Sequence, residues 1–169
     1  MESVPFLYGQ VCCFSGHRNL PKEKMANIIK RLDEEIEKLI AQDITTFIVG
    51  GALGFDYLAT IAVIKKREAN ENIRLIYALP CPSYNKKWLP EAQLLYKELF
   101  QTGADDVIYV SEKYSHDCFK KRNYFMIQNS QYCICALLHN RTRTGTGQTV
   151  RMAKEKGLTV INLLDDDSQ

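Results

Sequence analysis

The sequence TFIVGGALGFDYLA, residues 46–59, combines a short apolar run, a glycine turn and the beginning of a helical pattern. The run from Phe47 to Val49 is bounded by glycine, which is typical of a strand buried on both faces. Gly50 and Gly51 allow a sharp turn there, and the apolar spacing after Gly54 predicts a helix to about residue 69. Free backbone N–H groups at such a helix start can bind phosphate or carboxylate. The alternative is a tight connection whose small residues serve packing alone.

Bulk composition is that of one globular domain spanning residues 1–169. The chain is 46% hydrophobic and 25% charged. Its net charge of +2 is too small to indicate nucleic-acid binding by itself. No apolar run approaches the ~20 residues that cross a bilayer, and the start lacks the features of a signal peptide. A cytoplasmic protein that binds no membrane is therefore expected.

The six cysteines favour a reducing compartment and give no metal-binding pattern. No pair has the C-x-x-C spacing of a zinc or redox motif. Cys12, Cys13, Cys133 and Cys135 fall in predicted strands, where cysteine is typically a small buried hydrophobe. We expect neither a metal nor a cofactor.

Apolar runs alternate with helical patterns along the chain, which predicts an α/β fold. Specifically, we expect a Rossmann-like three-layer α/β/α sandwich with a mainly parallel six-stranded sheet and a core over about residues 11–163. The predicted strands are 8–14, 47–49, 73–79, 106–110, 131–138 and 158–163. The predicted helices lie at about 25–40, 55–69, 91–100, 118–129 and 150–156.

Polar loops follow several of these strands. The first strand is followed by Ser15, Gly16, His17 and Arg18, which could together contact an anion, with the Arg18 fork well suited to it. A solvated turn with a surface arginine is the alternative. Because parallel strands end at one edge of the sheet, the loops beginning at residues 15, 50, 80 and 139 are predicted to converge.

The loop at residues 139–149 is rich in Gly, Thr and Arg and precedes a predicted helix. Its backbone amides and hydroxyls, at Gly145, Thr146, Gly147 and Thr149, could form a second phosphate cradle. A surface loop capped by threonine is the alternative. Trp88, the sole tryptophan, could stack on a ligand ring, but packing on the domain is favoured.

Three common motifs are absent from the sequence. There is no G-x-x-x-x-G-K-[ST] loop, no G-x-G-x-x-G after the first strand and no G-x-S-x-G elbow. These absences argue against a P-loop NTPase, a common dinucleotide-binding enzyme and a serine hydrolase.

Four motifs in this order resemble the SLOG superfamily, which joins the DNA-processing DprA proteins and the LOG phosphoribohydrolases. The motifs are S-G-H-R at 15–18, G-G-A-x-G-x-D at 50–56, R-N-x-x-M at 122–126 and G-T-x-x-T at 145–149. Within it, the chain is most similar to the small stand-alone YpsA/YoqJ-type proteins of bacteria and prophages. The resemblance implies a nucleotide-type ligand held by the residues already named together with Ala52, Gly54, Asp56, Arg122 and Asn123.

The resemblance leaves catalysis open. LOG enzymes cleave the N-glycosidic bond of nucleoside 5′-monophosphates with a glutamate at the position that Thr149 occupies here. Thr149 cannot supply the negative charge that stabilises an oxocarbenium-like transition state. Arg122 matches the LOG arginine, whereas Asn123 replaces the usual lysine. Asp56 and Arg122 are the catalytic candidates, although Asp56 could instead cap the helix, hold the turn or bind a ligand hydroxyl.

Three functions follow from these observations. The first is a binding module or sensor for a nucleotide-derived small molecule. The second, its main alternative, is a LOG-like N-glycosidase. The third, less favoured, is DprA-like nucleic-acid binding through a basic face. That face comprises Arg141, Arg143, Arg151, Lys154 and Lys156. The apolar helix faces are also compatible with a homodimer.

Overall fold

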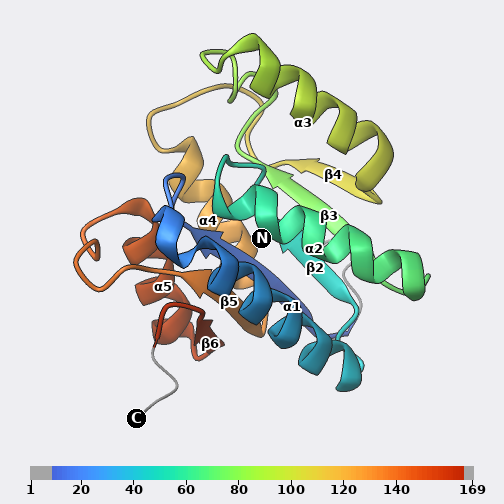
Figure 1. Cartoon of the computed structure of the whole chain (residues 1–169). Helices are drawn as coiled ribbons and strands as arrows, with labels where there is room; N and C mark the ends of the chain where they lie inside the picture. Colours follow the sequence, from blue (N-terminus) through green and yellow to red (C-terminus); the bar gives the residue numbers. More distant parts are fainter. Residues whose placement is uncertain (1–8, 166–169) are drawn as a thin grey trace.

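A six-stranded, all-parallel sheet forms the centre of the molecule (Figure 1). The computed structural model describes residues 9–165, apart from the side chains of residues 100 and 102. The strand order is β4-β3-β2-β1-β5-β6. The strands are β1 (Val11–Gly16), β2 (Thr46–Val49), β3 (Arg74–Leu79), β4 (Asp106–Tyr109), β5 (Tyr132–Ala136) and β6 (Thr159–Asn162).

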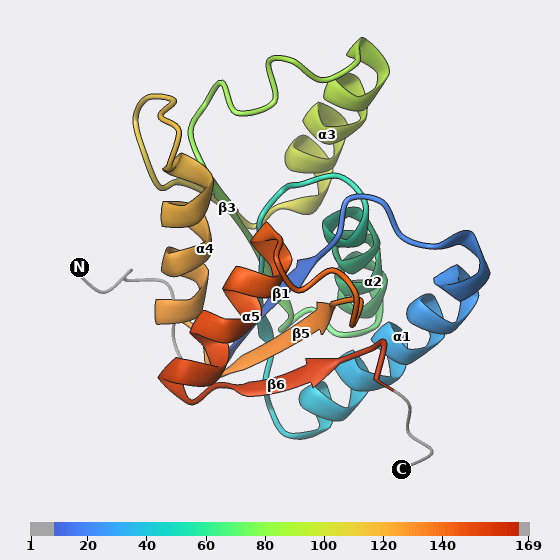
Figure 2. The ribbon, with the colours of Figure 1, turned by 90° about the vertical axis from the view of Figure 1, so that its left-hand side faces the viewer.

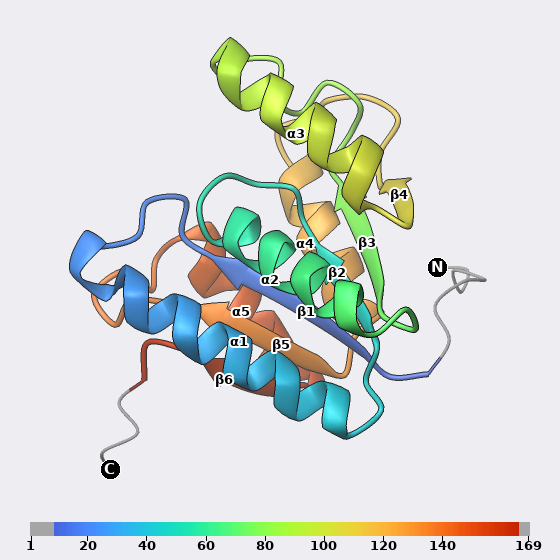
Figure 3. The same cartoon turned by 45° about the vertical axis from the view of Figure 1, so that its right-hand side comes forward.

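Helices cover both faces of the sheet and complete the three layers (Figures 2 and 3). The helices α1 and α2 pack on one face, and α4 and α5 pack on the other. The helix α3 stands beside the β3–β4 end of the sheet (Figure 1). Their bounds are α1 (Met25–Ala41), preceded by the 3-10 turn Lys22–Lys24, α2 (Phe55–Ala69), α3 (Pro90–Gly103), α4 (Cys118–Gln128) and α5 (Gly145–Lys156).

Alternating side chains of β1 supply both layers of the core. Cys12 and Phe14 pack under α1 and α2, while Val11 and Cys13 face α4 and α5. This period of two is what a fully buried parallel strand requires. The predicted Rossmann-like sandwich is thereby confirmed.

The order of the strands places a topological switch point between β1 and β5. From β1 the chain first adds β2, β3 and β4 on one side and then returns to add β5 and β6 on the other. Because the crossovers diverge there, the carboxyl ends of β1 and β5 leave a crevice, which is where open α/β sheets bind ligands.

Several element boundaries differ from those predicted. The strand β1 continues through Ser15 and Gly16 because these residues pair with Cys135 and Ala136 of β5. The helix α5 begins at Gly145 rather than near Val150, so the glycines and threonines expected in a loop are helical. In addition, α3 runs on to Gly103, and β5 ends at Ala136 rather than at residue 138. The predicted strand start at residue 8 and the acidic residues 166–169 lie outside the described residues.

Within residues 9–165, the helices are all too short or too polar to cross a membrane.

Candidate functional site

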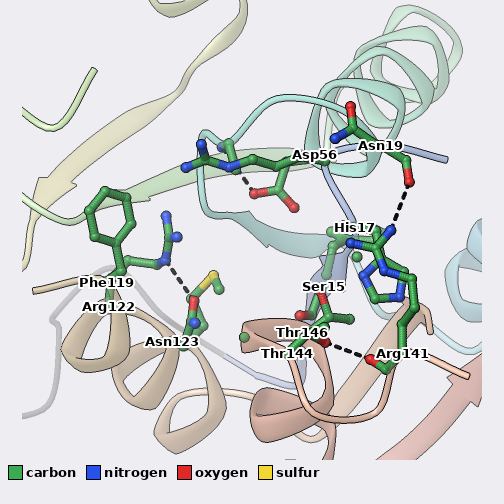
Figure 4. A pocket seen from close by; sticks show the side chains of 16 residues that line it. Ser15, His17, Asn19, Asp56, Phe119, Arg122, Asn123, Arg141, Thr144 and Thr146 are labelled. Atoms are coloured by element: carbon green, nitrogen blue, oxygen red, sulfur yellow. Dashed lines mark hydrogen bonds between the residues drawn. The ribbon is translucent and has the colours of Figure 1, made fainter. Parts of the chain in front are cut away.

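A cavity of about 420 Å³ opens at the β1–β5 switch point (Figure 4). In that view Phe119, Arg122 and Asn123 of α4 lie on one side and Arg141 on the other. The lining residues come from the end of β1, the turn before α2, the helix α4 and the start of α5. They are Phe14, Ser15, Gly16, His17, Arg18, Asn19, Ala52, Asp56, Phe119, Arg122, Asn123, Met126, Arg141, Thr144, Gly145 and Thr146.

The residue directly after β1 is a buried, neutral histidine. His17 is 3% exposed, and its Nε2 accepts a hydrogen bond of 3.1 Å from the Leu138 amide. Burial, together with the positive charge of Arg141, lowers the pKa of His17 below its ordinary value of 6.5. A proton on Nε2 would set two donors against each other, so both effects favour the neutral ring.

The first turn of α2 carries the cavity's carboxylate. Asp56, in the first turn of α2, is buried, and its Oδ2 accepts a hydrogen bond of 3.1 Å from the Ala52 amide. Burial raises the pKa of Asp56, while the positive charge of Arg122 and the Ala52 amide oppose that rise. Asp56 therefore holds its own turn, one of the roles expected for it, and still faces the cavity.

Opposite this carboxylate lies a buried guanidinium. Arg122 is 5% exposed and donates to the carbonyl of Gly50, while its Nε donates to Asn123 Oδ1 at 2.7 Å. Its Cζ lies 5.8 Å from the centre of the Phe119 ring, within the range of a cation–π contact. Burial lowers the pKa of Arg122, yet a guanidinium titrates far above neutral pH, so Arg122 remains a cation.

The start of α5 forms the third wall. Thr144 is its N-cap, and the Thr144 hydroxyl accepts a hydrogen bond of 3.2 Å from the Gly147 amide. Arg141 lies in the preceding loop, where its Nη1 donates to the carbonyl of Asn19 at 3.4 Å. The loops after β1 and β5 thus meet across the cavity.

Most of the predicted site residues come together at this cavity. Those that line it are Ser15, Gly16, His17, Arg18, Ala52, Asp56, Arg122, Asn123, Gly145 and Thr146.

Five residues predicted to contact the ligand do not line the cavity, and each has a packing role instead. Thr149 is buried inside α5, where its hydroxyl donates to the Gly145 carbonyl at 2.9 Å. The other four are glycines at points of close approach. A Cβ would meet Arg122 at Gly50, Leu79 at Gly51, the Arg18 backbone at Gly54 and the Thr142 backbone at Gly147.

Of the four loops expected to converge, the one that begins at Pro80 stays apart from the cavity. Trp88 of that loop packs edge-on against Tyr84 and Tyr96, with ring centres 5.4 and 5.0 Å away. The favoured interpretation of Trp88, packing on the domain, agrees with these contacts.

Several residues that line the cavity were not predicted from the sequence. Phe119 and Met126 follow the helical spacing of core residues, and Phe14 belongs to a buried strand, so none of them carries a polar signal. Asn19 and Thr144 are ordinary loop residues by sequence. Arg141 was assigned to a basic nucleic-acid face, and its position after β5 was the signal that it belongs to the cavity.

The cavity carries an excess of positive charge. Its charged lining residues are Arg18, Arg122 and Arg141 against the single carboxylate of Asp56. With His17 neutral, the arrangement suits an anionic ligand, and Asp56 remains available to accept a hydrogen bond from a ligand hydroxyl or amine.

Comparisons with known proteins agree with this architecture. The chain is 28% identical over 144 residues to the SPbeta prophage-derived protein YoqJ of Bacillus subtilis, covering 78% of this chain and 82% of YoqJ. The solved structures with a similar fold include DNA processing protein A (DprA) of Streptococcus pneumoniae, with a TM-score of 0.62 and 21% identity to this chain. That match covers 91% of this chain but only 50% of the longer protein.

A second DprA structure, from Helicobacter pylori, has a TM-score of 0.65 and 18% identity, covering 95% of this chain and 67% of that protein. That structure describes how the Helicobacter pylori protein binds single-stranded DNA. At these identities the structural likeness establishes the fold alone. The family model described as the YspA SLOG family matches residues 13–163, and the chain therefore belongs to that family.

Proposed function

We propose that the protein binds a nucleotide or nucleotide-derived small molecule in the switch-point cavity and serves as a binding module or sensor. One observation carries the proposal: three arginines face a single aspartate at the carboxyl ends of β1 and β5. A volume of about 420 Å³ is within the range of small-molecule sites. Family membership and the DprA-like fold support a nucleotide-related ligand.

The hydrogen bonds of the backbone N–H groups at the two helix starts indicate that the phosphate of a nucleotide would bind at the α5 end of the cavity. At the start of α2, the Ala52 amide already donates to Asp56 and the Phe55 amide donates to the His17 carbonyl. At the start of α5 the Gly147 amide donates to the Thr144 cap, but this helix start shares the cavity wall with Arg141, so its helix dipole and this guanidinium can act on one anion.

The opposite end suits a planar ring. Phe119 is half-buried on the cavity wall beside Arg122. Aromatic and guanidinium faces both stack on nucleobases. Between the two ends, Asp56 would accept hydrogen bonds from sugar hydroxyls.

A thermal-shift screen followed by calorimetry tests this proposal. The ligands are nucleoside 5′-monophosphates, adenosine diphosphate ribose, the matching nucleosides and inorganic phosphate. Binding stabilises the folded state by mass action, so a nucleotide should raise Tm more than its nucleoside does.

Arg18→Gln and Arg141→Gln should each weaken nucleotide binding about tenfold or more, because each removes a charge-assisted hydrogen bond. Arg143→Gln is the matched control, since Arg143 is exposed and does not line the cavity. An equal effect of all three substitutions, or no shift with any nucleotide, would contradict the proposal.

Nucleotide N-glycosidase activity is a second candidate, favoured by the buried Asp56 carboxylate close to the cationic Arg122. A carboxylate there could stabilise positive charge developing at the sugar. Chromatography after incubation with nucleoside monophosphates would detect free base, and Asp56→Asn should abolish its release. Absence of base release would leave the binding role alone.

Nucleic-acid binding has less support from the side chains. In the predicted basic face, Arg151 donates to the Thr142 carbonyl and Lys156 donates to the Gln128 carbonyl. Titration with a single-stranded oligonucleotide at rising salt concentration tests it, because phosphate contacts make binding steeply salt-dependent.

We also infer a reducing compartment such as the cytoplasm, since all six cysteines are buried and free.

A further inference from the structure

Three successive backbone carbonyls in the turn after β2 each accept a hydrogen bond from a side chain of a different segment. In residues 50–52, the first carbonyl accepts from Arg122 of α4, and the second accepts from the Tyr84 hydroxyl at 2.8 Å. The third accepts from the Tyr96 hydroxyl of α3. Since hydrogen bonds within helices and sheets normally satisfy backbone carbonyls, this concentration of side-chain donors marks a backbone whose conformation is externally fixed.

The two tyrosines are well suited to this role. Tyr84 is 7% exposed and Tyr96 is fully buried. Burial raises the pKa of both phenols well above the ordinary value of 10, so both hydroxyls keep their protons. Trp88 packs edge-on between the two rings and restrains their orientation.

The same turn presents the amide that holds the cavity's carboxylate. One side of residue Ala52 is fixed through its carbonyl by Tyr96, and its amide donates to Asp56 Oδ2 at 3.1 Å. Next to it, Gly51 has φ of 71°, and a Cβ there would lie 2.9 Å from the Tyr84 hydroxyl. The Gly51 carbonyl and the Ala52 amide belong to one planar peptide, so a rotation of that peptide would move the Ala52 amide relative to Asp56, while Tyr96 fixes the next peptide along the chain.

Neither tyrosine lines the cavity. Both lie in the part of the chain between β3 and the end of α3, and α3 stands at the outer end of the molecule (Figures 1 and 3). The hydrogen bonds of their hydroxyls connect to the cavity through the backbone of residues 50–52.

We propose that Tyr84 and Tyr96 are positioning residues of the switch-point site, which hold the turn so that the Ala52 amide faces the Asp56 carboxylate. The segment around α3 thereby sets the geometry of a cavity that it does not touch. This inference rests on the proposed function insofar as Asp56 contacts a ligand, but its effect on Asp56 itself is independent of any ligand.

Conservative variants test the inference. Tyr84→Phe and Tyr96→Phe keep each ring and remove each hydroxyl. Tyr57→Phe is the matched control, because Tyr57 lies 6.4 Å from the Tyr96 ring and its hydroxyl donates to none of the described residues. Both the whole chain without ligand and the chain with adenosine 5′-monophosphate are measured.

The first readout is the pKa of the Asp56 carboxyl, followed by carbon-13 NMR in the absence of ligand. Loss of either hydroxyl should loosen the Ala52 amide and raise the pKa of Asp56, whereas Tyr57→Phe should leave it unchanged. The second readout is affinity for adenosine 5′-monophosphate, expected to fall about threefold to tenfold in each test variant.

A merely structural role would lower Tm without moving the Asp56 pKa, and that result would overturn the inference. If the parent protein binds no adenosine 5′-monophosphate, the proposed function is weakened, but the titration of Asp56 still decides the role of the tyrosines. If Tyr96→Phe fails to fold, Tyr84→Phe carries the same test through the neighbouring carbonyl.

Discussion

Gly50 separates the two buried charges of the site. A Cβ at this position would lie 2.7 Å from Arg122 Nη1 and 3.0 Å from Asp56 Oδ2. Gly50→Ala should therefore displace the guanidinium and lower the free energy of unfolding by about 1–3 kcal/mol. Urea unfolding measures the change. Gly145→Ala is the stability control, because a Cβ there meets no atom within 4 Å. If Gly50→Ala left the free energy of unfolding unchanged, the two charges would be able to move apart without cost.

Asp56 has opposite effects on the two parts of a nucleotide. Its charge repels phosphate, while its oxygens can accept hydrogen bonds from sugar hydroxyls. Asp56→Asn should therefore raise the affinity for inorganic phosphate and lower that for nucleoside monophosphates about tenfold, as expected for a lost charge-assisted hydrogen bond. Calorimetry with both ligands measures the contrast. A parallel change in both affinities would place Asp56 away from the sugar.

At the scale of the element, the N-cap of α5 connects stability to the site. Thr144 accepts the Gly147 amide at 3.2 Å, so Thr144→Ala should cost about 1 kcal/mol of unfolding free energy. Thr144→Ser keeps an accepting hydroxyl and should restore most of the loss. Chemical denaturation distinguishes the two variants. Equal stability of Ala and Ser at this position would mean that the capping bond contributes nothing measurable.

The type of each element was predictable from the sequence because the spacing of apolar residues and the positions of turn-forming residues agree along this chain. The helix α2 ends at Ala69 as expected, where its apolar period stops. Boundaries failed where tertiary pairing decides them: Ser15 stays in β1 because it pairs with Cys135 of β5. Likewise, Gly145 is a poor helix former, yet α5 begins at Gly145 because Thr144, the residue before it, is the N-cap of the helix.

At the scale of the whole molecule, the edge on which the loops gather follows from parallel strands, but their distances do not. The strand order brings the loops after β1 and β5 together at the switch point, whereas the loop after β3 lies two strands away from β1. That order explains why residues near Arg141 line the cavity and Trp88 does not. Local sequence patterns contain no information on strand order, so this distinction required the structure.

Stability should depend on pH through His17. Its pKa in the folded protein lies below 6.5, its ordinary and unfolded value, so the unfolded chain binds the proton more readily. The contribution of His17 is therefore fully present above about pH 6.5 and is lost as the pH falls through the folded pKa. Asp56 has the opposite sign, because its folded pKa is raised above 3.8 and protonation relieves its burial.

His17→Gln separates the two groups. A glutamine oxygen can accept the Leu138 amide in place of Nε2 but does not titrate. Urea unfolding at intervals between about pH 7.5 and 5 should show the wild-type protein losing stability relative to His17→Gln as the pH falls. Parallel curves for the two proteins would mean that His17 titrates alike in the folded and unfolded chains, and that its hydrogen bond with Leu138 does not keep the ring neutral.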